Sequence, residues 1–336
     1  MGLVSSKNDF QNIARCFEQF QMAYQSQNYG IAYQSFVEAL SLNAGMAYRY
    51  FVSRASFPLD STTLHTGKSR ELATWLDALI VEYPNMHLLC DDDQKTVQRI
   101  IELRESNIQK GLPSIVLVTQ GKAASVSVAS IFNSGFNLPS VAYSFVTLEV
   151  IESWARDYAR GGACYTTHLL PTRRNIACLK RSGIDKVIVH VRDPRQSLLS
   201  MIHHVSRYPD QLVRLAREFG EKSIAQQIDD LLAVYVSRVH WILGWIEAES
   251  EMNIMFSTFE EFVQDEERFI RRYLDFYGAP IEHFSYQNAV TRHEGTDYHF
   301  RSGEIAEWRD HFPSKQASYL SNWIPRELKE RFGWSD

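Results

Sequence analysis

A lysine and several hydroxyl groups follow directly after a run of β-branched residues, Ser114–Thr119. The residues that come next are Gln120, Gly121, Lys122, Ala123, Ala124, Ser125, Val126 and Ser127. Backbone N–H groups at the start of a helix attract anions, and Lys122 adds a mobile positive charge. The segment is not a Walker A motif, because Val116 stands where that motif has its first glycine. It predicts an anion cradle, and the alternative is an ordinary strand–helix turn with an exposed lysine.

An arginine and a hydroxyl group occur in the same way after a second hydrophobic run, Lys186–Val191. Arg192 comes at the end of this run, Pro194 can open a helix, and Ser200 falls two turns further on. An arginine fork together with a hydroxyl group is suited to a phosphate monoester. The alternative is that Arg192 pairs with a carboxylate and that Ser200 merely fits the helix.

These segments resemble the donor-binding motifs of sulfotransferases that use 3′-phosphoadenosine 5′-phosphosulfate (PAPS). The R-x-P-x-x-x-x-x-S pattern that begins at Arg192 resembles their 3′-phosphate motif, and the Lys122 turn resembles their 5′-phosphosulfate loop. Further along, Thr167–Pro171 resembles the T-H-L-P segment, and 301–312 resembles the C-terminal R-K-G-x-x-G-D-W-K-N-x-F block. Phe259-Glu260-Glu261 is similar to their Y-E-D-L segment. The resemblance covers residues 113–336.

The resemblance implies a role for each motif. Lys122 would contact the bridging or leaving oxygen of the phosphosulfate, and Ser125 and Ser127 would hold the 5′-phosphate with the amides of the turn. His168 would be the general base, a task suited to a side chain that titrates near neutrality. The residues that would hold the 3′-phosphate are Arg192, Ser200, Arg301 and Gly303, and Phe259 and Ser302 would also bind the donor. The same site would hold the product, 3′-phosphoadenosine 5′-phosphate (PAP), and no metal is expected.

Three positions depart from the family pattern. Thr166 stands where the cytosolic enzymes have a lysine, so one cationic contact to the transferred group is lost. Ser127 replaces the tryptophan that stacks on adenine, and Phe259 replaces a tyrosine that contacts adenine. Adenine must therefore be held differently in this chain.

Strands that alternate with amphipathic helices predict an α/β domain over 113–336, with a central parallel sheet flanked by helices. In such a sheet the ligands bind at the carboxyl ends of the strands. A third strand is expected at Asn253–Ser257, a long helix at 224–246 and a shorter one at 265–277, with a candidate lid at 285–303. Residues 1–112 show apolar spacing near 3.6 and predict a helical N-terminal region. Its stripe at 29–40 resembles half of a tetratricopeptide repeat, without a second copy.

Composition excludes several classes of protein. The chain has 336 residues and a net charge of −5, which disfavours a nucleic-acid binder. Its four cysteines form no CxxC pair and no zinc-type cluster. Neither a secretory signal nor a membrane span is evident, so we expect a cytoplasmic protein. Met1–Ser6 fits the pattern for N-myristoylation, a short motif that often occurs by chance.

Two other functions fit parts of the sequence. A P-loop-type kinase would need a Walker lysine in its glycine frame and an acidic magnesium ligand after a strand, and neither is evident. A non-catalytic scaffold with a degenerate nucleotide pocket would explain Thr166 but not the retained cations. The acceptor stays open among a glycan, a lipid and a small metabolite, each offering a hydroxyl or an amine.

Overall fold

The structure is a computed structural model, and it describes residues 2–26, 31, 34–35, 38–39, 94–141, 150, 152–207, 217–290 and 303–336. Most of the predicted apolar stripe at 29–40 lies outside these residues, as does the segment 72–83 of the expected helical N-terminal region. So does the segment 291–302, which makes up most of the candidate lid.

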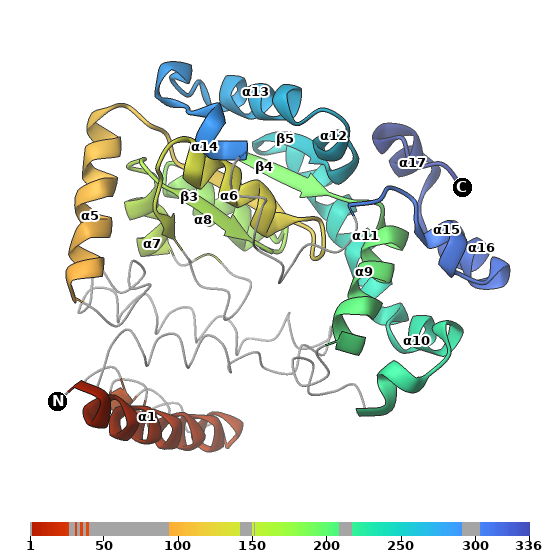
Figure 1. The fold of residues 1–336 in the computed structure, drawn as a ribbon, viewed down its shortest axis with the longest axis horizontal. Helices are drawn as coiled ribbons and strands as arrows, with labels where there is room; N and C mark the ends of the chain where they lie inside the picture. The colour runs from red at the N-terminus through yellow and green to blue at the C-terminus, as the bar shows by residue number, and fades with distance from the viewer. Residues whose placement is uncertain are drawn as a thin grey trace.

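A parallel sheet forms the centre of the fold (Figure 1). Its strand order is β2-β3-β1-β4-β5, and every described pair of strands is parallel. The strands are β1 (Ile115–Thr119), β2 (Ser140–Val141), β3 (Cys164–Thr167), β4 (Lys186–Val191) and β5 (Asn253–Thr258). The expected α/β class with a central parallel sheet is thus confirmed.

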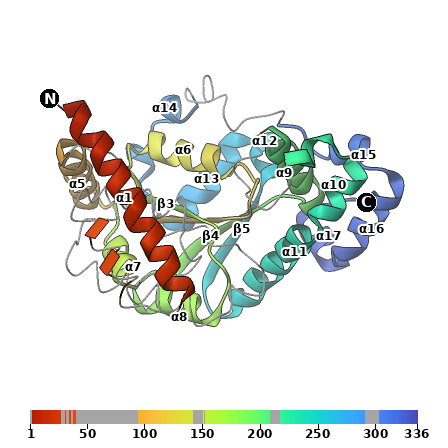
Figure 2. The ribbon, with the colours of Figure 1, turned by 90° about the horizontal axis from the view of Figure 1, so that it is seen from below.

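Helices cover both faces of the sheet, as Figure 2 shows from below. Alternate residues of β1 point to opposite sides: Ile115 and Leu117 pack in one hydrophobic cluster, Val116 and Val118 in the other. The first cluster lies against α6 (Ser125–Gly135), α12 (Phe259–Gln264), α13 (Glu266–Tyr277) and α14 (Tyr286–Val290). The second includes α8 (Arg173–Arg181), α9 (Pro194–Arg207), α10 (Ile224–Asp230) and α11 (Leu232–Glu247). Burial on both faces explains why the strands read as continuous apolar runs.

The sequence pattern located three of the strands and missed two. β1, β4 and β5 lie where hydrophobic runs predict them. β3 was not predicted, because the segment Cys164–Thr167 is short and its two threonines interrupt the apolar pattern. The expected long helix at 224–246 is interrupted at Leu231, whose φ of −100° and ψ of 5° end α10 before α11 begins. The helix predicted at 265–277 is α13, and Gly278 caps it in the left-handed conformation at φ 62°.

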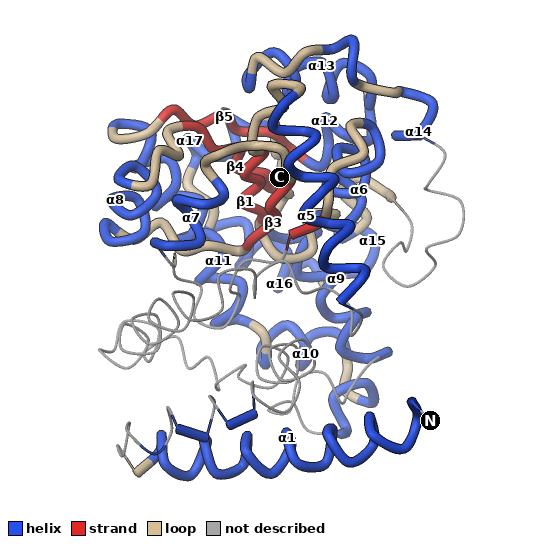
Figure 3. The backbone as a smooth tube through the Cα atoms, turned by 90° about the vertical axis from the view of Figure 1, so that its left-hand side faces the viewer, coloured by secondary structure: helices blue, strands red, loops and turns tan. Residues whose placement is uncertain are grey.

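Two helices are described in the N-terminal third, α1 (Gly2–Gln25) and α5 (Gln94–Gln109), and Figure 3 shows α1 far from the sheet. Both lie within residues 1–112, which the apolar spacing predicts to be helical. α5 is tied to α7 (Glu152–Tyr158) because the buried Arg104 donates to the Asp157 carboxylate at 2.5 Å and to the carbonyl of Gly161 at 3.2 Å. The proposed domain boundary at residue 113 stays a prediction.

Helix α11 holds the segment that follows β3. The indole N–H groups of Trp241 and Trp245 both donate to the carbonyl of Leu169, at 2.8 and 3.2 Å. One turn along, Gly244 lets Pro171 approach the helix closely: a Cβ at Gly244 would lie 2.6 Å from Pro171 Cγ. The position of His168 beside this segment therefore depends on α11.

We predict that Gly244→Ala lowers the free energy of unfolding by about 1–2 kcal/mol. The overlap with Pro171 outweighs the gain of less than about 1 kcal/mol that alanine normally brings inside a helix. Gly220→Ala is the control, since a Cβ there meets nothing nearer than 3.7 Å, and it should change stability by less than about 0.5 kcal/mol. Urea denaturation of both variants tests this, and a Gly244→Ala protein as stable as the wild type would contradict the packing described.

Candidate active site

The three predicted site segments meet at the carboxyl edge of the sheet. Adjacent strands β3, β1 and β4 end there, and hydrogen bonds join the residues that follow them. His168 Nδ1 lies 2.6 Å from the carbonyl oxygen of Thr119, and the Arg192 backbone N–H donates to Gln120 Oε1 at 2.9 Å. Arg192 Nη1 also donates to the carbonyl of Lys122 at 3.4 Å. Lys122, His168 and Arg192, far apart in the sequence, thus share one network.

The loop between β1 and α6 has the geometry of an anion cradle. Lys122 and Ala124 both adopt left-handed conformations, with φ of 67° and 64°, although this costs a non-glycine residue about 1–3 kcal/mol. No side chain caps the start of α6, so its first N–H groups keep their hydrogen-bonding capacity. Ser125 and Ser127 are half-buried in its first turn, and Val126 is exposed. A strained loop before an uncapped helix start favours a bound phosphate or sulfate group.

Two basic side chains are close together beside this loop. Burial, and then the charge of Arg238 on α11, lower the pKa of Lys122 to about 8. Burial also lowers the pKa of Arg238 to about 10. Neither side chain has a carboxylate within ion-pair distance among the described residues. Two adjacent cations without a counter-ion make a site that fits a polyanion such as PAPS.

His168 is held as a neutral base. A carbonyl oxygen can only accept a hydrogen bond, so the contact with Thr119 places the proton on Nδ1 and leaves the lone pair on Nε2. Burial is the largest cause that lowers its pKa, and the charges of Arg238 and Lys122 act in the same direction. At neutral pH the imidazole is therefore uncharged and able to take up a proton.

Arg192 lies under the C-terminal segment of the chain. Its guanidinium carbon is 3.6 Å from the centre of the Phe259 ring, and its Nη2 donates to the carbonyl of Glu304 at 3.0 Å. Phe259 is buried at the start of α12, where it supports the arginine. The contact with Glu304 brings Gly303, in the left-handed conformation at φ 70°, to the same edge. The structure thus joins three of the predicted donor-binding segments.

For three other predicted site residues the structure gives less information. Ser200 is half-buried on α9. Arg301 and Ser302 lie outside the described residues. The positions of Arg192, Phe259 and Gly303 agree with one common site, while the role assigned to each residue stays a prediction.

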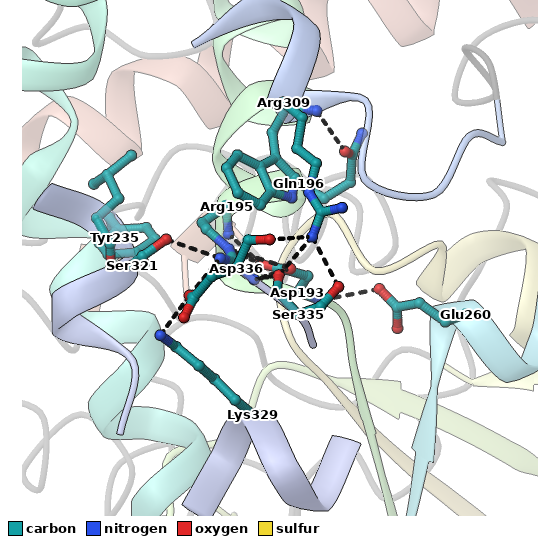
Figure 4. Close-up of polar contacts among 12 residues, drawn as sticks. Asp193, Arg195, Gln196, Tyr235, Glu260, Arg309, Ser321, Lys329, Ser335 and Asp336 are labelled. Carbon is teal, nitrogen blue, oxygen red and sulfur yellow. Dashed lines mark hydrogen bonds and ion pairs between the residues drawn. The ribbon is translucent and has the colours of Figure 1, made fainter. Parts of the chain in front are cut away.

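A fully buried arginine anchors the C-terminal segment to this site (Figure 4). Arg195 Nη2 donates to Asp193 Oδ2 at 2.7 Å and to the carbonyl of Ser335 at 2.9 Å, and Nη1 donates to Ser321 Oγ at 2.8 Å. Its guanidinium carbon also lies 4.1 Å from the Trp308 ring centre. These contacts join the start of α9 to α15 (Trp308–His311), to α16 (Ser314–Trp323) and to the residues that follow α17 (Arg326–Phe332). Trp308 itself is buried.

Sequence reasoning missed several polar residues of the site. Gln120 and Ser197 lie inside motifs that were recognised, and both hydrogen-bond across them: Ser197 Oγ donates to the carbonyl of Gly121 at 2.7 Å. Glu260 Oε1 accepts from the Asp193 N–H at 3.2 Å, and burial raises the pKa of its carboxyl to about 7. Arg238 was missed because it belongs to no motif. The sequence feature that could have identified it is a charged residue among the apolar positions of a helix, between Tyr235 and Val239.

The described residues contain no group of histidine, cysteine and acidic side chains arranged to hold a metal. Likewise, none of the helices in the described ranges is long and apolar enough to cross a membrane.

Solved structures with a similar arrangement include a mouse sulfotransferase, SULT7A1, complexed with PAP. It is 16% identical, with a TM-score of 0.47, and the match covers 66% of this chain and 88% of that one. Retinol dehydratase in a complex with retinol and PAP is 14% identical, with a TM-score of 0.40 over 71% and 88% of the two chains. No curated protein matches the sequence significantly. These similarities are too low to carry the assignment, which rests on a family match.

The family model that describes the sulfotransferase domain matches residues 164–332. The matched segment begins at β3 and includes His168, Arg192 and Gly303, whereas Lys122 and its loop precede it. The resemblance seen in the sequence motifs is thereby confirmed. Because the match spans half of the chain, this protein belongs to the sulfotransferase domain family, whose enzymes use PAPS as their donor.

Proposed function

We propose that this enzyme transfers the sulfuryl group of PAPS to a hydroxyl or amine of its acceptor, with His168 as general base. One observation carries the proposal: His168 and Arg192 both hydrogen-bond to the segment Thr119–Lys122, His168 through the carbonyl of Thr119 and Arg192 through Gln120 and the carbonyl of Lys122. An edge that supplies a neutral base and several cations is suited to a reaction in which negative charge develops on a leaving phosphate.

The chain's own residues divide the work. Lys122 and the uncapped start of α6 bind the 5′-phosphosulfate, and Arg192 binds the 3′-phosphate. His168 Nε2 accepts the acceptor's proton, while Nδ1 stays on the carbonyl of Thr119 and fixes the ring. PAPS supplies the sulfuryl group: a bond forms from the acceptor atom to sulfur as the bond from sulfur to the bridging oxygen breaks, and that oxygen keeps the electron pair in the product PAP.

We predict that PAP binds without a metal and raises the melting temperature by mass action. The measurement is a thermal melt with PAP in the presence of EDTA, beside a melt with ATP and Mg²⁺. A shift with ATP–Mg²⁺ and none with millimolar PAP would favour the kinase alternative and contradict the proposal.

Two variants distinguish residues that bind PAP from residues that take part in the transfer reaction. Arg192→Ala removes a charge-assisted contact, so its affinity for PAP should fall by about 2–3 kcal/mol. His168→Ala should bind PAP as the wild type does, and its turnover should fall about a hundredfold to ten-thousandfold, the usual range for loss of a general base. Calorimetry with PAP, thermal melting and a transfer assay test this. If His168→Ala melts normally and transfers sulfate at the wild-type rate, His168 is not the base.

The pH profile of kcat/KM for the donor should be bell-shaped. His168 must be neutral, and because its pKa is lowered, the acid limb should lie below the usual range of histidine. Lys122 must be charged, and since its pKa is about 8, activity should fall as the pH rises through about 8. Lys122→Arg is the control: its guanidinium stays charged, so the alkaline limb should disappear. An unchanged alkaline limb in Lys122→Arg would exclude Lys122 as its origin.

A further inference from the structure

Arg238 is a buried cation with few polar contacts among the described residues. It lies in the middle of α11, and 8% of its surface is exposed. Its only hydrogen bond within the described ranges runs from Nη1 to Ser197 Oγ, at 2.7 Å. None of the carboxylates in these ranges lies within ion-pair distance of the guanidinium.

The guanidinium lies beside the loop that follows β1. A Cβ added at Gly121 would be 3.3 Å from Arg238 Nη2, so the absence of a side chain there admits the arginine. Ser197, which accepts from Arg238, donates in turn to the carbonyl of Gly121 at 2.7 Å. The positive charge also lowers the pKa values of Lys122 and His168. Arg238 therefore acts on the same space as the proposed base and the loop lysine.

Other buried arginines of this chain show what a structural arginine looks like here. Arg195 is fully buried, and the Asp193 carboxylate neutralises it. Arg104 is 3% exposed and pairs with Asp157 at 2.5 Å. Arg238 has no such partner and lies close to a second cation. A buried, uncompensated charge destabilises a protein, and an apolar side chain of similar size would be more favourable.

We propose that Arg238 binds the 5′-phosphosulfate end of the donor, together with Lys122. This inference rests on the proposed function and adds an anion-binding residue to it. A planar guanidinium with several N–H donors matches the oxygens of a phosphate or sulfate group. The arriving anion supplies the counter-charge that the described residues lack, and the fork then stabilises the negative charge that develops on the leaving 5′-phosphate.

The position of Arg238 predicts which part of the nucleotide it recognises. The proposed function assigns Arg192 to the 3′-phosphate, whereas Arg238 lies beside Gly121 in the loop proposed to hold the 5′-phosphosulfate, so we expect the two arginines to bind opposite ends of the donor. Adenosine 3′-monophosphate lacks the 5′-phosphate and adenosine 5′-monophosphate lacks the 3′-phosphate. Together with PAP, the two monophosphates separate the arginines by calorimetry.

Three substitutions of Arg238 separate charge from shape. Arg238→Lys keeps the charge, Arg238→Gln keeps a donor for Ser197 without the charge, and Arg238→Met keeps only the bulk. We expect affinity for PAP to fall at least tenfold in the Gln and Met variants and clearly less in the Lys variant. Affinity for adenosine 3′-monophosphate should change less than twofold in all three. Arg192→Ala should show the reverse, with weaker binding of PAP and unchanged binding of adenosine 5′-monophosphate.

Two further readouts respond to the charge itself. Without ligand, Arg238→Met should melt no lower than the wild type, because it removes an unneutralised buried charge. The pKa of Lys122 should rise, so the loss of PAP affinity at alkaline pH should move to higher pH. The titratable and charged groups that face Lys122 are Arg238 on α11, His168 after β3 and Arg192 after β4, and only the first changes in this variant.

The outcomes decide between the two claims. If the wild type binds PAP and the Gln variant binds it equally well, Arg238 does not bind the donor, although the proposed function stands. If the Lys and Gln variants lose PAP affinity and melting temperature to the same extent, the arginine is structural and the inference is overturned. A wild type that does not bind PAP at all contradicts the proposed function itself.

Discussion

Electrostatic repulsion between the half-buried Lys122 and the buried Arg238 is the constraint on which the site depends. Lys122 and Arg238 lie beside one loop, and each lacks a carboxylate partner within the described residues. The strands β3, β1 and β4 end at this edge, and the uncapped start of α6, which carries a partial positive charge, adds to the positive potential there. The unneutralised charges lower the free energy of unfolding of the ligand-free protein. A bound polyanion raises it again, because the ligand neutralises both charges.

Helix α11 links the two halves of the chemistry. Its Trp241 and Trp245 hold the carbonyl of Leu169, next to His168, while Arg238 on the same helix reaches the loop after β1 through Ser197. One helix thus contacts both the segment that carries His168, the proposed base, and the loop that carries Lys122. The segment of His168 and the loop of Lys122 were recognised from their sequence motifs. Both contact α11, a helix that contains no motif.

The sequence predicted the α/β class, three of the strands and the segments that meet at the site. These follow from local patterns: continuous apolar runs, and a lysine or an arginine directly after a strand. β3 could not be seen, because four residues with two threonines are too short for a periodic signal. Arg238 was missed for another reason. Comparison of motifs predicted that Thr166 removes a cation, and only the packing of α11 against the loop shows a cation arriving from elsewhere.

Proton uptake on PAP binding tests the central claim most directly. Near pH 8 about half of the Lys122 amines are neutral, and a bound polyanion raises the pKa of a neighbouring amine. Calorimetry in buffers that differ in ionisation enthalpy should therefore show net uptake of about half a proton at pH 8, and little uptake in Lys122→Arg. Tight binding of PAP without proton uptake would contradict the account of paired, unneutralised cations.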